Sequence, residues 1–212
     1  MTEHDPFGRG RVRRLFGLDR SAAPPPSTRK GEPFHPWTIP NAVGYLRLAA
    51  LPLFLVLAYN TEDGTSLASA MVFWAIAAGD YLDGILARIT GQYSRLGALL
   101  DPLVDRLTIL AGAVVCWSFD LLPHWALLLL ALREVAMLFL AQYGLRHGVD
   151  IEVNWPGRIS VFPIMGGIFL ALLAPGWVAT ALLIWGLVMA IIATVLYAQH
   201  GIRAVRDTQA AS

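Results

Sequence analysis

Six apolar runs of near-membrane length limit what this chain can fold into. They cover residues 39–58, 67–89, 96–118, 122–144, 158–174 and 177–199. A helix needs roughly 20 apolar residues to cross a bilayer. Hydrophobic residues make up 56% of the chain and charged residues 15%, whereas soluble domains have roughly 45–50% and 25%. Six such helices would leave a soluble bundle with too little polar surface. We therefore predict an all-α, polytopic membrane protein with six transmembrane helices.

The positions of lysine and arginine predict the orientation in the membrane. Of the 16 residues, seven lie in the first 36 positions, four flank the links after the second and fourth runs, two lie in the C-terminal tail and three lie inside runs. The other three links contain none. The positive-inside rule therefore places both termini and the basic links in the cytoplasm. We predict a multi-pass protein of the cell membrane.

The remaining sequence suggests three segments. Residues 1–32 are polar and basic and predict a disordered cytoplasmic arm, which is either attracted to anionic lipid or inert. Residues 33–200 form the predicted membrane domain, and residues 201–212 form a cytoplasmic tail. The one cysteine, Cys116, excludes an intrachain disulfide. The net charge of +1 does not indicate a partner, and we expect no nucleic-acid binding.

Acidic residues interrupt the second and third runs at helical spacing. One face of the second predicted helix carries Asp80, Asp83, Gly84, Ala87 and Arg88, and one face of the third carries Gly97, Asp101 and Asp105. We call these two faces the acidic stripes. At 1.5 Å per residue, Asp80 lies about 12 Å from Arg88, and Asp105 lies about 12 Å from Gly97. Asp83 and Asp101 lie about 6–8 Å from the same marks. We therefore expect the carboxylates to meet as two level pairs near the cytoplasmic side.

Four clustered carboxylates cannot all stay charged without compensation. Divalent cations could supply it, and hard oxygen ligands suit Mg²⁺ or Mn²⁺. Neither stripe contains histidine or cysteine, which argues against zinc. A structural alternative is neutralisation by protons or by Arg88 and Arg106. Acidic residues inside membranes are usually functional, so we favour a metal site.

The two stripes together resemble a known signature. The pattern Asp80-x-x-Asp83-Gly84-x-x-Ala87-Arg88, then eight residues, Gly97, three residues, Asp101, three residues and Asp105 is similar to that of the CDP-alcohol phosphatidyltransferase family. All eight fixed residues match over 26 positions, and the resemblance covers residues 37–199. It implies a six-helix enzyme, commonly a homodimer, that transfers the phosphatidyl group of CDP-diacylglycerol to an alcohol and releases CMP.

The resemblance also implies roles for individual residues. Asp80, Asp83, Asp101 and Asp105 would ligate two Mg²⁺ or Mn²⁺ ions, and Asp105 would also take the proton from the attacking hydroxyl. The residues expected to bind CDP-diacylglycerol are Asn41, Gly84, Arg88, Ser94 and Gly97.

The acceptor is indicated less directly. The stretches "GQYSRLGALLDPLVDRL" and "ALREV" resemble the glycerophosphate and cardiolipin branch of the family, of actinobacterial type. We predict sn-glycerol 3-phosphate first and phosphatidylglycerol second. A phosphate-bearing acceptor needs cations, and Arg133 and Arg158 are the candidates, with Arg47 and Arg106 behind them. Alternatively, Arg133 forms a salt bridge with Glu134 or another acid, and Arg158 is an interfacial anchor.

Three other classes of protein could also carry acidic residues in a membrane helix. A metal or proton transporter would place its acids near the midplane, often with broken helices and a repeat. A membrane prenyltransferase would carry two separate Asp-rich motifs and more helices. An inactive scaffold would not need an intact set of acids.

Overall fold

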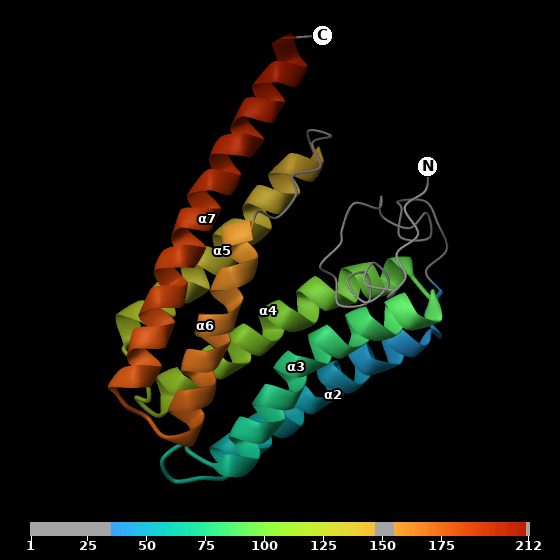
Figure 1. The fold of residues 1–212 in the computed structure, drawn as a ribbon. Coiled ribbons are helices and arrows are strands. Elements are labelled where there is room, and N and C mark those ends of the chain that lie inside the picture. Colours follow the sequence, from blue (N-terminus) through green and yellow to red (C-terminus); the bar gives the residue numbers. More distant parts are fainter. Residues whose placement is uncertain (1–34, 147–154, 211–212) are drawn as a thin grey trace, which may run out of the picture. The chain divides into compact units, whose positions relative to one another are not determined.

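Six helices make up the part of the chain that the structure describes. A computed structural model describes residues 35–146 and 155–210. Its helices are α2 (Ile39–Tyr59), α3 (Leu67–Thr90), α4 (Arg95–Ser118), α5 (His124–Arg146), α6 (Trp155–Leu173) and α7 (Trp177–Ala210) (Figure 1). No strand occurs among these residues. The all-α prediction with six helices is therefore confirmed, whereas the predicted arm at residues 1–32 lies outside the described residues.

The helix ends agree with the predicted runs to within three residues, with one exception. The last helix was predicted to end at residue 199, and α7 continues to Ala210. The candidate membrane span within α7 covers Trp177–Gln199, among the residues whose side chains the structure describes. The helix is longer than the predicted apolar run because hydropathy marks where a segment stops being apolar, and a polar segment can continue the same helix.

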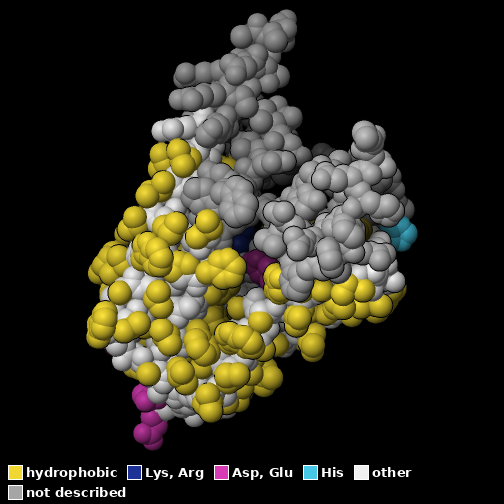
Figure 2. All heavy atoms as spheres, viewed as in Figure 1, with side chains coloured by type: hydrophobic (Ala, Val, Ile, Leu, Met, Phe, Trp, Pro, Cys, Tyr) yellow, Lys and Arg dark blue, Asp and Glu magenta, His cyan; other side chains and the backbone are white. Residues whose placement is uncertain are grey.

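Three of the helices are long and apolar enough to cross a membrane, by length and composition alone. These are Ile39–Tyr59, Leu67–Thr90 and the Trp177–Gln199 part of α7. Helix α6 has a shorter apolar part, Ile159–Leu173. Many large hydrophobic side chains are exposed, and Figure 2 shows hydrophobic side chains over much of the described surface on the face that it draws. Extensive exposed apolar surface is unusual in soluble monomers and fits a membrane protein.

The chain divides into two compact units. The first contains the chain through Leu53 together with Trp74–Thr108, and the second contains Phe54–Phe73 and the chain from Ile109 onward. The first unit therefore holds the start of α2, the end of α3 and the start of α4. Every residue of the acidic signature lies in this unit.

Close packing of α6 on α7 builds much of the second unit (Figure 1). Gly167 makes this approach possible, because a Cβ there would lie 2.8 Å from the backbone nitrogen of Leu183 and 2.9 Å from the carbonyl oxygen of Ala179. Both helices carry fully buried side chains, among them Ile168, Leu172 and Leu183. Small residues commonly allow such close helix contacts in membranes.

Candidate active site

A short link between α3 and α4 sets the relative register of the two acidic stripes. Helix α3 ends at Thr90, and Gly91 follows with φ of 66°, the left-handed conformation that glycine adopts readily at a helix C-terminus. Ser94 then caps α4, because its Oγ accepts a hydrogen bond of 2.9 Å from the backbone nitrogen of Gly97. The chain thus reverses just beyond the end of the first stripe.

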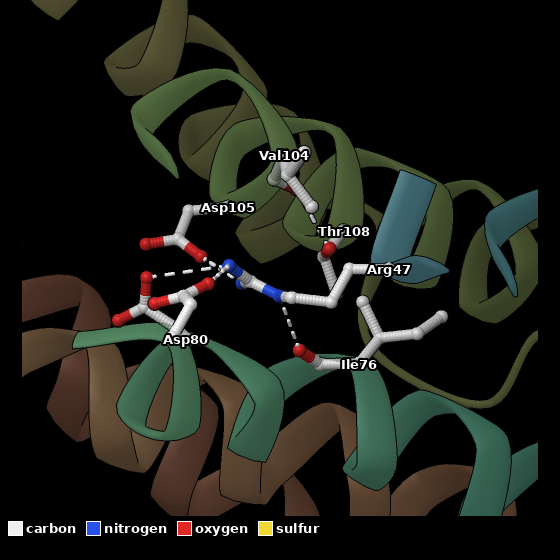
Figure 3. Close-up of polar contacts among 7 residues, drawn as sticks. Arg47, Ile76, Asp80, Val104, Asp105 and Thr108 are labelled. Carbon is white, nitrogen blue, oxygen red and sulfur yellow. Dashed lines mark hydrogen bonds and ion pairs between the residues drawn. The ribbon is translucent and has the colours of Figure 1, made fainter. Parts of the chain in front are cut away.

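Arg47 of α2 lies at the centre of the acidic cluster (Figure 3). Its Nη2 contacts Oδ1 of Asp105 at 2.6 Å. Its Nη1 contacts Oδ2 of Asp83 at 3.1 Å and Oδ1 of Asp80 at 3.4 Å. One guanidinium therefore forms ion pairs with three carboxylates from two helices.

The members of this cluster differ in exposure. The side chains of Arg47 and Asp83 are only 3% and 4% exposed, whereas those of Asp105 and Asp80 are 34% and 46% exposed. Asp101 is half-buried and lies within electrostatic range of the three other aspartates. The cluster thus has a closed side at Arg47 and an accessible side at Asp80 and Asp105.

The structure brings the predicted carboxylates together, with an arginine among them. The expected meeting of Asp80 with Asp105 occurs at the guanidinium of Arg47. Asp83 likewise forms an ion pair with Arg47. From the sequence, Arg47 is only a low-ranked candidate for binding the phosphate of the acceptor.

The donor chemistry of the cluster fits a hard divalent cation, since four carboxylates come from facing helices. As the side chains stand, no three acidic, histidine or cysteine groups of the described residues are arranged to hold a metal ion. The three carboxylates converge instead on Arg47. The residue types therefore fit a metal, whereas their positions are those of a cluster that surrounds a guanidinium.

Three residues predicted to bind CDP-diacylglycerol form a second cluster. The Ser94 hydroxyl donates to Oδ1 of Asn41 at 2.8 Å, and both side chains are buried. A Cβ on Gly97 would lie 2.7 Å from the same Oδ1, so only glycine leaves room for the contact. Asn41 also donates from Nδ2 to the carbonyls of His35 and Pro36, each at 3.1 Å.

An open recess lies beside this second cluster. Residues 35–38 and 91–93 line a space of about 510 Å³. The hydrogen bonds of Asn41 fix one wall of the recess, and the link before Ser94 forms the other. The remaining CDP candidates, Gly84 and Arg88, lie one turn apart, and a Cβ on Gly84 would lie 3.6 Å from Nη2 of Arg88.

The two acceptor candidates belong to the second unit. Arg133 forms an ion pair with Glu134, and its Nε donates to Oγ1 of Thr194 at 3.2 Å. The salt-bridge alternative for Arg133 is therefore what the structure has. Arg158 lies in the first turn of α6, and its side chain is outside the described part of the chain. The acceptor role of both arginines stays a prediction.

The comparisons with known proteins agree with the signature. The family model described as CDP-alcohol phosphatidyltransferase matches residues 37–194. The chain is 38% identical over 171 residues to a cardiolipin synthase (CMP-forming) of Streptomyces coelicolor, covering 78% of this chain and 80% of that protein. It is 27% identical over 138 residues to a CDP-diacylglycerol–glycerol-3-phosphate 3-phosphatidyltransferase of Bacillus subtilis, covering 59% and 72%.

Proposed function

Because the chain belongs to the CDP-alcohol phosphatidyltransferase family, we propose that it transfers the phosphatidyl group of CDP-diacylglycerol to an alcohol and releases CMP. The observation that carries the proposal is the convergence of Asp80, Asp83 and Asp105 on one point, in the same unit as the buried pair Asn41 and Ser94. The first group offers carboxylates for metal and proton chemistry, and the second fixes the wall of the recess beside which a nucleotide is proposed to lie.

Asp105 is the proposed general base. Its Oδ1 is held by Arg47, while the side chain is 34% exposed. In Figure 3 the second carboxylate oxygen of Asp105 points away from the guanidinium. That oxygen can therefore take the proton of an attacking hydroxyl, and a positioned base of this kind contributes about 10²–10⁴-fold to a rate.

The aspartates would also hold the metal. We propose that Asp80, Asp83, Asp101 and Asp105 hold two divalent cations, Mg²⁺ or Mn²⁺. When bound, such ions neutralise the diphosphate and stabilise the leaving CMP. The exposed sides of Asp80 and Asp105 support this proposal, since they leave carboxylate oxygens accessible.

The nucleotide end of the substrate is proposed to lie against Asn41, Ser94 and Gly97, next to the recess of residues 35–38 and 91–93. Arg88, which lies against Gly84, is proposed to donate to phosphate through its planar guanidinium.

For the acceptor, we propose phosphatidylglycerol, which would give cardiolipin. The similarity to the Streptomyces cardiolipin synthase spans more of the chain than the similarity to the Bacillus glycerol-3-phosphate enzyme. In addition, Glu134 neutralises Arg133, the arginine predicted to bind the doubly charged phosphate of glycerol 3-phosphate. Glycerol 3-phosphate is the second candidate, because the Bacillus relative carries that activity in its name.

The setting in the membrane is also a proposal. We propose that residues 33–200 form one membrane domain with all six helices spanning the bilayer. Both termini, the arm of residues 1–32 and the tail of residues 201–212, would face the cytoplasm with the active site. We propose a homodimer, as is common in the family.

The test is an acceptor assay. The purified protein in nanodiscs receives CDP-diacylglycerol and Mg²⁺, with phosphatidylglycerol, glycerol 3-phosphate or inositol phosphate added separately. We expect CMP release and cardiolipin with phosphatidylglycerol, and none in the Asp105→Asn variant. CMP release with glycerol 3-phosphate alone would establish the second candidate, and release with inositol phosphate alone would exclude both. Mn²⁺ uptake into proteoliposomes without CDP-lipid would point to a transporter.

A further inference from the structure

We infer that Arg47 is a fixed positioning residue, which holds three carboxylates of the site by one oxygen each and so leaves the second oxygens of Asp80 and Asp105 on the accessible side. The inference rests on the proposed function, in that these carboxylates are the proposed metal ligands. It concerns what α2 contributes to a site whose acids all come from α3 and α4.

The guanidinium is anchored independently of the acids. Its Nε donates to the backbone carbonyl of Ile76 at 2.9 Å, and the side chain is 3% exposed. The aliphatic part of Arg47 crosses α3 at Gly79, where a Cβ would lie 2.7 Å from Cδ and 2.8 Å from Cγ of the arginine. The Arg47 side chain is therefore held along its whole length. Because Gly79 has no side chain, it leaves the space in which the aliphatic part of Arg47 lies.

The division of contacts supports a positioning role. Arg47 contacts one oxygen each of Asp80, Asp83 and Asp105. The planar fork of an arginine can serve several acceptors at fixed angles, whereas a lysine is a single point charge. Because Asp83 is 4% exposed, its charge has little water to stabilise it and depends on this cation. Without Arg47 the carboxylates would repel one another and lose their common direction.

The sharpest test leaves every charge unchanged. In Gly79→Ala, the added methyl collides with Cδ of Arg47, and the guanidinium must leave its place. Gly44→Ala is the control, because Gly44 is likewise a glycine inside a helix, here α2, and no atom lies within 4 Å of its added Cβ. We expect Gly79→Ala to lower the Tm of the metal-free protein by about 5 °C, and Gly44→Ala to leave it within about 2 °C. Equal shifts in the two variants would overturn the inference.

A double-mutant cycle tests whether the cost of Gly79→Ala arises from its contact with Arg47. Arg47→Ala is expected to lower the Tm by about 10 °C, since it leaves a buried carboxylate without its cation. Adding Gly79→Ala to Arg47→Ala should cost nothing further, because the colliding Cδ is gone. An unchanged cost of Gly79→Ala in this background would mean that Gly79 does not serve Arg47.

Metal binding provides the second readout, with Mn²⁺ alone as the probe. Removing a residue that orients metal ligands typically weakens binding about 10–100-fold, so we expect the Kd for Mn²⁺ to rise by that factor in Arg47→Ala and by less in Arg47→Lys. Equal or tighter Mn²⁺ binding by Arg47→Ala would overturn the inference, because the guanidinium would then compete with the ion.

The Tm cycle tests the role of Arg47 and the acceptor assay tests the proposed function, so either hypothesis can fail without the other. If the Gly79–Arg47 coupling holds but no acceptor releases CMP, only the proposed function falls. If CMP is released but the coupling is absent, only the role of Arg47 falls.

Discussion

The substitution Ser94→Ala would remove two hydrogen bonds at one buried point. The Ser94 hydroxyl accepts from the backbone nitrogen of Gly97 at 2.9 Å and donates to Oδ1 of Asn41 at 2.8 Å. Loss of the helix cap costs about 1 kcal/mol. Asn41 is 2% exposed, so leaving its Oδ1 without a donor costs about a further 1–3 kcal/mol. The expected destabilisation is therefore about 2–4 kcal/mol, or about 5–15 °C in Tm.

The assay follows tryptophan fluorescence on heating in nanodiscs, with the KM for CDP-diacylglycerol measured alongside. We expect the KM to rise about fivefold, as for the loss of one hydrogen bond. Ser94→Thr keeps the hydroxyl and should behave like the unchanged protein. Ser118→Ala is the matched control, because that hydroxyl is exposed and bonds to Val114 and Tyr59. A Ser94→Ala shift no larger than that of Ser118→Ala would refute the reasoning.

Three other predictions concern catalysis, metal and packing. Asp105→Asn should lower kcat at least about 100-fold in the CMP-release assay, and near-normal turnover would exclude Asp105 as the base. Removing divalent cations with EDTA should abolish CMP release and excess Mg²⁺ or Mn²⁺ should restore it, so activity that persists in EDTA would contradict a metal role. Gly167→Ala should destabilise the protein by about 1–3 kcal/mol in thermal unfolding, because its Cβ would lie 2.8 Å from Leu183. Gly166→Ala, whose nearest neighbour is 3.9 Å away, should be nearly neutral, and equal losses would argue against close helix packing at Gly167.

The sequence was a good guide to the helices and to the acids, for different reasons. Helix ends were predictable because apolar runs stop where polar links begin, as at Tyr59 and Leu67. The convergence of Asp80 and Asp105 was predictable from helical spacing and from equal distances to one link. The end of α7 at Ala210 was not predictable, since the charged and polar residues past Gln199 end the apolar run without ending the helix.

The central role of Arg47 was missed because spacing within one helix cannot reveal a partner on another. One signal was present: Asn41, Gly44, Arg47, Leu51 and Phe54 repeat at intervals of three and four, and all five are buried in the structure. An arginine on the face that also carries apolar core residues indicates a buried counter-charge. For Arg133, the neighbouring Glu134 already suggested the ion pair that the structure has.

The ion pairs of Arg47 have a consequence for how the chain is synthesised. Arg47 is the ninth residue of α2, and an arginine near the middle of a helix raises the free energy of membrane insertion by about 2.5–3.5 kcal/mol. If α2 inserts as the chain leaves the ribosome, it does so before any of its carboxylate partners exists. Asp80 and Asp83 follow only with α3, and Asp105 only with α4. Helix α2 therefore gains its full set of partners only after α4 has been made, and a chain truncated after α2 should leave that helix poorly retained in the bilayer.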